Sequence, residues 1–282
     1  MIYLDHLVAT ALIYGLLAMS LDLIVVECGL LSVAHASFFG VGAYAVALLG
    51  RYWNMGAVLA SAVGIALILS VCISWPAVRL HGDFYVLATF AFQSAFSSVL
   101  TNWTAVTRGP AGIADIRNPF RLSASNLLIP ALIGLSILIV ALFVRVGRSP
   151  FGEVIRSVRD DEVLVAAAGY SPAAYRIRAV AIGAVVASTA GCAYAYQITY
   201  VDPSSFTIAD SILMLAMVVV ASEWRWIGPW LGAGLFVIVP EVLRFTGFAE
   251  PAAALVRQMI FGGLLVSVAQ LARRRRPMWM ER

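Results

Sequence analysis

Lysine is absent from this sequence of 282 residues, and all 19 of its basic residues are arginines. Without lysine the chain cannot hold a Walker A phosphate-binding loop, which needs a lysine beside the phosphates. Schiff-base chemistry on a lysine amine is excluded for the same reason. Charged residues make up 12% of the chain, whereas a soluble domain has about 25%. The sequence therefore predicts a protein of the lipid bilayer that has no phosphate-binding loop of its own.

Cysteine is also rare. Cys28, Cys72 and Cys192 lie in or beside apolar stretches without CxxC spacing, which is typical of packing residues and not of metal ligands or a disulfide framework. His35 has no second histidine or cysteine beside it, so we expect a hydrogen-bonded packing residue. The HExxH motif and a Ser-His-Asp order are missing as well. The sequence thus predicts neither a catalytic site nor a metal site.

Apolar stretches dominate what is present, because 62% of the residues are hydrophobic. About nine stretches are long enough to cross, or nearly cross, a bilayer, at residues 6–26, 30–50, 56–78, 84–102, 126–146, 177–199, 209–222, 228–246 and 254–272. The seventh is short, so the expected number of crossings is about eight to nine. The predicted fold class is all-α, a polytopic transmembrane helical bundle that forms a single domain over residues 1–282.

The placement of arginine orients these crossings. With the segment 145–178 and the arginines at 273–276 on the inner side, nine crossings put the N-terminus outside and the C-terminus inside. Arg51 and Arg108 belong to the minority that then lie outside. The first apolar stretch follows an acidic residue and no basic one, so we expect a retained span and not a cleaved signal peptide.

The segment 145–178 is the one long polar run in the chain. Two Ser-Pro pairs, at 149–150 and 171–172, supply a hydroxyl N-cap and a proline at the first helical position. Between them the pattern predicts one amphipathic helix over 151–168, with Gly169 as its stop and a second helix from Pro172. Its apolar face would hold Val154, Ile155, Val158 and Val165. We expect the pairs Arg156–Asp160 and Arg159–Glu162 on its polar face.

Two interpretations of this helix are open. It could be a solvated connector resting on lipid headgroups. The mixture of Glu153, Asp160, Asp161 and Glu162 with the arginines argues against a helix made only for anionic lipid. We therefore favour a docking element for another protein.

Polar residues inside the spans suggest two further roles. Thr89, Gln93, Ser94, Ser97 and Ser98 make one side of the fourth span polar, which favours the lining of a cavity over simple interhelical hydrogen bonding. Acidic residues in or beside spans could instead serve a proton-coupled carrier. The candidates for that role are Asp22, Glu27 and Glu241.

Several stretches together resemble the inner-membrane permease subunits of branched-chain amino acid ABC importers, and specifically the M-type member of the heterodimeric permease pair. The stretch 151–182 (FGEVIRSVRDDEVLVAAAGYSPAAYRIRAVAI) is similar to the cytoplasmic loop whose helix fits a cleft in the ATPase subunit. The other stretches are 29–49 (GLLSVAHASFFGVGAYAVALL), 79–92 (RLHGDFYVLATFAF), 100–113 (LTNWTAVTRGPAGI) and 226–233 (WIGPWLGA).

The resemblance implies roles for individual residues. Coupling to the ATPase within the loop 147–178 would involve Arg156, Arg159, Asp160, Asp161, Glu162 and Gly169. Packing beside the translocation pathway, together with Thr89 and Gln93, would involve Ser32, His35, Gly40, Gly42 and Tyr44. The external loop beneath a periplasmic solute-binding protein would be shaped by Gly109, Pro110 and Gly112.

The resemblance also implies the partners and the location. These are a second homologous permease subunit, two ABC ATPase subunits that hydrolyse the ATP, the solute-binding protein and the bilayer of the bacterial inner membrane. We expect no cofactor on this chain, no enzyme activity and no nucleic acid. The family's glycine-rich turn is replaced here by Ala221–Arg225, so importers of urea, amides or aromatic and other organic acids remain alternatives. A structural membrane scaffold is a weaker one.

Overall fold

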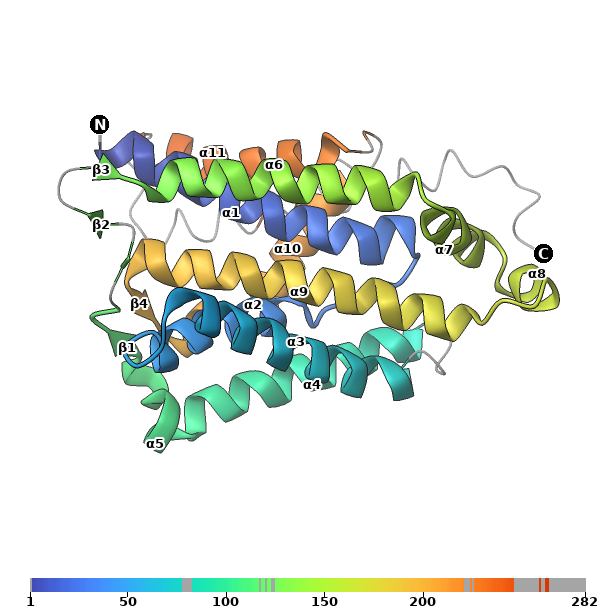
Figure 1. Cartoon of the computed structure of the whole chain (residues 1–282), viewed down its shortest axis with the longest axis horizontal. Helices are drawn as coiled ribbons and strands as arrows, with labels where there is room; N and C mark the ends of the chain where they lie inside the picture. The colour runs from blue at the N-terminus through green and yellow to red at the C-terminus, as the bar shows by residue number, and fades with distance from the viewer. Residues whose placement is uncertain are drawn as a thin grey trace.

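The computed structural model describes residues 2–77, 83–116, 118–119, 121–122, 125–220, 224, 226–245, 259 and 262–263. Within these residues the chain is a bundle of helices with two short two-stranded ladders (Figure 1). The predicted all-α class is therefore confirmed.

Five helices of the described part are long and apolar enough to cross a membrane. They are α1 (Ile2–Asp22), which a π-helix continues over Leu23–Glu27, and α3 (Met55–Ala77), α4 (Asp83–Asn102), α6 (Leu128–Gly147) and α9 (Pro172–Ile198). Each coincides with one of the predicted apolar stretches. A polytopic membrane protein is thus confirmed, and the count of eight to nine crossings stays a prediction.

Three further apolar helices are shorter: α2 (His35–Leu49), α10 (Ile208–Val220) and α11 (Gly228–Phe245). With 15 and 13 residues, α2 and α10 are only about 22 and 20 Å long, whereas a bilayer core is about 30 Å thick. The prediction of a span over 30–50 placed its start too early, because residues 28–34 are not helical. The predicted stretch 254–272 lies almost wholly outside the described residues.

Helix α9 forms the centre of the bundle and packs against α1, α2 and α3 (Figure 1). Glycines bring α2 and α9 together. A Cβ atom on Gly42 would lie 1.8 Å from the carbonyl oxygen of Ser188, and one on Gly191 would lie 2.0 Å from that of Phe39. Small residues at a helix contact let the two backbones approach closely in lipid, and any larger side chain at either glycine would push α2 and α9 apart.

The two ends of the bundle differ (Figure 1). One end, called the α7 end below, carries α7 (Pro150–Asp160) and α8 (Glu162–Ala167). The other, called the strand end, carries α5 (Thr104–Thr107), 3-10 turns at Gly109–Ala111 and Pro203–Ser205, and the strands. β1 (Ile113–Ala114) pairs antiparallel with β4 (Tyr200–Val201), and β2 (Arg121–Leu122) pairs antiparallel with β3 (Ser125–Asn126).

Candidate functional site

The predicted docking helix is present as two helices. Asp161 is extended (φ −154°, ψ 101°) and divides α7 from α8. Its Oδ1 atom accepts hydrogen bonds from the backbone N–H groups of Val163 and Leu164, both at 2.9 Å. Asp161 is therefore the N-cap of a new helix. The prediction of one continuous helix over 151–168 was wrong for this reason.

The predicted ends of these helices are confirmed. Ser149 and Ser171 occupy the N-cap positions of α7 and α9, and Pro150 and Pro172 follow them. Neither serine caps through its hydroxyl, however, and Ser149 Oγ donates instead to the carbonyl oxygen of Val146 at 2.6 Å. Gly169 has a φ of 88°, as expected of a residue that terminates a helix in the left-handed conformation.

One side of α7 and α8 is buried against the bundle. Of the four residues predicted for the apolar face, Ile155, Val158 and Val165 are buried and Val154 is half-buried. The opposite side leaves Asp160 exposed together with two large apolar side chains, Val163 at 79% and Leu164 at 67% relative exposure. Figure 1 shows α7 beyond the ends of α1 and α6, and α8 beyond the end of α9 as well. The segment thus offers an acidic and apolar surface outside the bundle.

Charged residues attach α7 to the rest of the chain. Arg156 forms an ion pair with Glu27 at 3.0 Å and also donates to the carbonyl oxygen of Gly147 at 3.0 Å. The predicted pair Arg156–Asp160 was wrong because Arg156 turns inward, toward the end of the first span. Arg156 and Glu27 are 26% and 10% exposed, so water screens their attraction only in part.

The neighbouring arginine also points to the bundle. Arg159 donates to the carbonyl oxygen of Val26 at 2.8 Å and pairs with the adjacent Asp160 at 2.9 Å. Glu162 pairs with Arg176 on α9 at 2.8 Å. The predicted pair Arg159–Glu162 was wrong because the break at Asp161 removes the helical spacing between them.

Arg159 lies over the non-helical residues 28–34, called the linker below, which lead into α2. Gly29 in the linker has a φ of 74°, and a Cβ atom there would lie 2.6 Å from Cγ of Arg159. Glycine is thus required both by the backbone conformation and by the arginine stem. Beside it, burial raises the pKa of the Cys28 thiol to about 12, so this cysteine stays protonated and unreactive at neutral pH.

Beyond the linker, buried polar side chains join α1, α2, α4 and α10; we call them the central polar cluster. Ser20 Oγ and His35 Nε2 lie 2.7 Å apart, Thr89 accepts from the Val33 N–H at 3.2 Å, and Ser211 accepts from the Ala36 N–H at 3.1 Å. The first turns of α2 and α10 therefore meet here. His35 is the hydrogen-bonded packing residue that was predicted. Ser20 and Ser211 were missed, although both are polar residues within apolar stretches.

Gln93 is the most connected member of the central polar cluster. Its Oε1 atom accepts from the Ser37 hydroxyl, and its Nε2 atom donates to the carbonyl oxygen of Phe206 at 2.9 Å. Gln93 and Thr89 are buried, at 0% and 1% exposure. For these two residues the geometry favours interhelical hydrogen bonding over the predicted lining of a cavity. Ser94 and Ser98 lie on the exposed side of α4.

The structure places the remaining predicted residues in two regions. Ser32, Gly40, Gly42 and Tyr44 are buried in the bundle, and their part in a translocation pathway stays a prediction. Gly109, Pro110 and Gly112 form a tight turn at the strand end, in which both glycines have positive φ angles of 55° and 65°. That turn lies at the opposite end of the bundle from α7.

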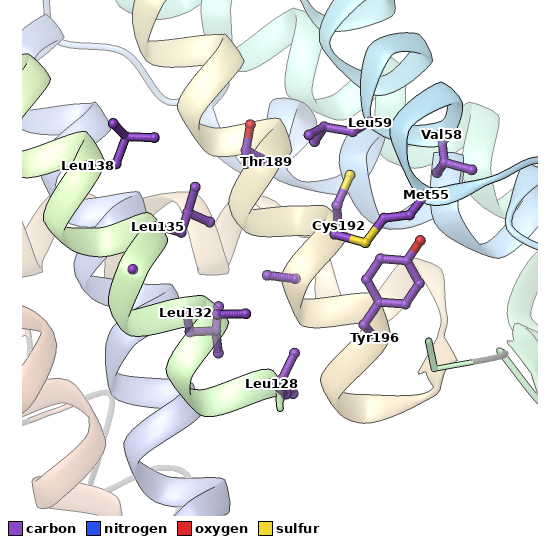
Figure 2. Close-up of a pocket in the computed structure, with 13 residues that line it drawn as sticks. Met55, Val58, Leu59, Leu128, Leu132, Leu135, Leu138, Thr189, Cys192 and Tyr196 are labelled. Carbon is purple, nitrogen blue, oxygen red and sulfur yellow. The ribbon is translucent and has the colours of Figure 1, made fainter. Parts of the chain in front are cut away.

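An apolar groove of about 310 Å³ opens between α3, α6 and α9. Figure 2 shows Leu132 and Leu135 on one wall, Met55 and Leu59 on the other, and Cys192 on α9 at its floor. Hydrocarbon fits such a lining, whereas a charged solute would lose its hydration there without compensation. The groove is therefore no candidate for the site of a charged solute.

Comparisons with known proteins give a consistent result. The family model described as branched-chain amino acid transport system / permease component matches residues 3–269. The chain is 30% identical over 290 residues to the high-affinity branched-chain amino acid transport system permease protein LivM of Escherichia coli (strain K12). The aligned region covers 90% of this chain and 65% of that protein. The LivM protein of Salmonella typhimurium gives the same identity and coverage over 284 residues.

A more distant relative is the probable branched-chain amino acid transport permease protein LivM of Methanocaldococcus jannaschii. It is 24% identical over 218 residues, which are 75% of this chain and 59% of that protein. The chain thus spans 65% of the length of the two bacterial relatives. No solved structure matches it.

Proposed function

The chain belongs to the branched-chain amino acid transport system permease family, and from this premise we propose that it forms half of the translocation pathway of an ABC importer. The solutes are branched-chain, hydrophobic amino acids delivered by a periplasmic binding protein. A second homologous permease subunit completes the pathway, and two separate ATPase subunits bind and hydrolyse the ATP. The chain itself is a multi-pass protein of the bacterial inner membrane and catalyses no reaction.

The projecting surface of α7 and α8 is the observation that carries this proposal. Exposed large apolar residues grouped outside a protein core mark an interaction site, and Val163 and Leu164 are such residues. The acidic Asp160 beside them would repel anionic lipid headgroups. A cleft in an ATPase subunit could bind this combination of apolar and acidic side chains. Within the predicted coupling set, Asp160 would touch the partner, whereas Arg156, Arg159, Asp161 and Glu162 hold the two helices in place.

An ion pair and a hydrogen bond connect α7 to the end of the first span. Movement of α7 would displace Glu27 through Arg156 and Val26 through Arg159. Val26 and Glu27 directly precede the linker to α2. Closure of the ATPase dimer would in this way shift the start of α2 against α10. Such coupling through packed elements with two arrangements is an established form of switching.

Orientation and crossings are part of the proposal. The arginines of the described residues are more numerous at the α7 end than at the strand end. The α7 end holds Arg145, Arg148, Arg156, Arg159, Arg176 and Arg178, and the strand end holds Arg51, Arg108 and Arg121. By the preference of arginine for the cytoplasmic side, the α7 end and the C-terminus face the cytoplasm and the N-terminus faces outward. Helices α2, α10 and α11, together with the stretch 254–272, would bring the number of crossings to about eight to nine.

Reconstitution tests the function. The chain is assembled in proteoliposomes with its permease partner, the ATPases and the binding protein, and ATP-dependent uptake of labelled leucine is measured. Leu164→Asp should abolish both uptake and copurification of the ATPases, since a charge would enter the apolar contact. The matched control Ala105→Asp adds the same charge to exposed α5 at the strand end and should keep ATPase copurification.

The outcomes separate the alternatives. Assembly and ATP hydrolysis without leucine uptake would redirect the substrate to urea, amides or organic acids. Uptake driven by a pH gradient in the absence of ATPases would instead establish a proton-coupled carrier. Glu27, one of its three candidate residues, is held in an ion pair with Arg156, so the geometry does not favour that mechanism. No assembly with any ATPase would refute the importer.

A further inference from the structure

An open cleft of about 900 Å³ lies at the strand end. One wall comes from the end of α2 and the turn that joins α2 to α3, and it includes Arg51. The other wall comes from the segment that runs from α5 to just past β1, and it includes Arg108 and Asp115. Binding sites for small molecules have volumes of about 300–1,000 Å³. The cleft therefore has the size of a small-molecule site and is separate from the α7 surface and the central polar cluster.

The charged groups of the cleft are available to a ligand. Arg51, Arg108 and Asp115 are exposed, and among the described residues no ion pair joins any of them to another side chain. Arginine binds a carboxylate through two parallel N–H groups, which is the strongest recognition of this anion available to a side chain. Two such cations and one carboxylate in one cleft suit a ligand that carries charges of both signs.

Between these charges the lining also has an apolar part. Val106 of α5 is exposed, and Leu48 at the end of α2 and Ile113 of β1 are half-buried, whereas Val46 and Ile116 behind them are buried. Specific small-molecule sites combine an apolar wall with a few placed polar groups, of which the polar groups fix the orientation of the ligand. Val106, Leu48 and Ile113 form the apolar wall that an aliphatic side chain could contact.

Unusual backbone conformations occur at the same place. Arg108 and Asp115 have φ angles of 60° and 61°, and both line the cleft. The third non-glycine residue of the described part with positive φ, Thr199, accepts a hydrogen bond from the N–H of Ile116 at 3.3 Å. Arg108 and Thr199 are the left-handed C-caps of α5 and α9, which is a common way for a helix to end. Asp115 does not end a helix, so its unfavourable conformation is the one of the three that points to a functional position.

We propose that this cleft is a recognition site for a zwitterionic amino acid with an apolar side chain. Arg51 and Arg108 bind the α-carboxylate, Asp115 binds the α-ammonium group, and the apolar wall receives the side chain. The inference rests on the proposed function, because it locates on this subunit a first contact for the substrate class of the importer. A solute leaving the binding protein would meet it before entering the bundle.

The test is equilibrium binding of labelled leucine to the complete transporter in nanodiscs, without the binding protein. Two competitors each lack one charge: 3-methylbutylamine has no carboxylate, and 4-methylpentanoate has no ammonium group. With the wild-type chain both should compete at least tenfold more weakly than leucine. Arg51→Ala and Arg108→Ala should remove the advantage of leucine over the amine, and Asp115→Asn its advantage over the carboxylate. The control Arg145→Ala, at the α7 end, should leave all three affinities unchanged.

Other outcomes overturn the proposal. No leucine binding by the wild-type transporter, or unchanged affinities in the three cleft variants, would refute it. If the cleft variants bind leucine normally but bind the solute-binding protein more weakly, in a salt-dependent manner, the cleft is a docking surface for acidic side chains instead. ATP-driven leucine uptake by the wild-type system, measured in parallel with the binding protein present, shows whether the proposed function stands when this inference fails.

Discussion

Arg156 and Glu27 form their ion pair across 129 residues of sequence. Local rules assign Arg156 to Asp160, four residues on, because that spacing is favourable on an isolated helix. The real partner belongs to the first span, and no local pattern can name it. The sequence placed Arg156 on the polar face of the helix, so the inward turn of its side chain was not predicted either. The buried apolar face of the helix was thus predictable here, whereas the direction and the long-range partner of Arg156 required the structure.

Gly29 is the linker residue that lies against the side chain of Arg159 on α7. Gly29→Ala should destabilise the folded chain by about 1–2 kcal/mol, because a left-handed alanine is strained, and it should also displace Arg159, whose Cγ would lie 2.6 Å from the new methyl group. Thermal unfolding in detergent measures the stability, and reconstituted uptake measures the coupling.

The matched control for Gly29 is Gly134→Ala. Gly134 lies within α6 and has no atom within 4 Å of the added Cβ position, so alanine should be neutral or stabilise the helix by up to about 1 kcal/mol. Equal effects at the two glycines would contradict the steric role given to Gly29.

At the scale of single elements, α7 and α8 show which helix limits can be read from sequence. The starts at Pro150 and Pro172 and the stop at Gly169 follow from strong local signals, and all three were confirmed. The break at Asp161 was missed, because Asp160, Asp161 and Glu162 also fit a polar helix face. Aspartate is a preferred N-cap residue, and glutamate is favourable in the first turn of a helix. Asp161 and Glu162 fit this pattern, so the sequence does contain a signal for a new helix at the break.

Asp161 is predicted to act through its cap and not through contact with an ATPase. Asp161→Ala removes the acceptor of two backbone N–H groups and should cost about 1 kcal/mol. It should also weaken ATPase copurification, because α8 loses its fixed start. Asp161→Asn keeps a side-chain oxygen and should behave like the wild type in both measurements. If asparagine fails as alanine does, the charge matters, and Asp161 touches the partner directly.

At the scale of the whole molecule, three regions follow one another along the length of the bundle. The surface of α7 and α8 lies at one end, the cleft with Arg51 and Arg108 at the other, and the central polar cluster between them where α2 and α10 begin. Both of these helices are too short to cross alone, and their first turns share hydrogen bonds with α4. Hydropathy predicted the long spans well. It could not show where a short helix begins in the membrane, because apolar composition continues through the linker.

Substitution of Gln93 tests whether the central polar cluster holds helices together or lines the translocation pathway. If it holds helices together, Gln93→Leu leaves the Ser37 hydroxyl and the carbonyl oxygen of Phe206 without their buried partner, at a cost of about 1–3 kcal/mol. Ser94→Leu, on the exposed side of the same helix, should change stability by less than about 0.5 kcal/mol. Unfolding of the assembled complex in detergent measures both variants. If instead Gln93→Leu keeps wild-type stability and changes only which solutes are taken up, the residue lines the pathway, and the interpretation from sequence alone is correct after all.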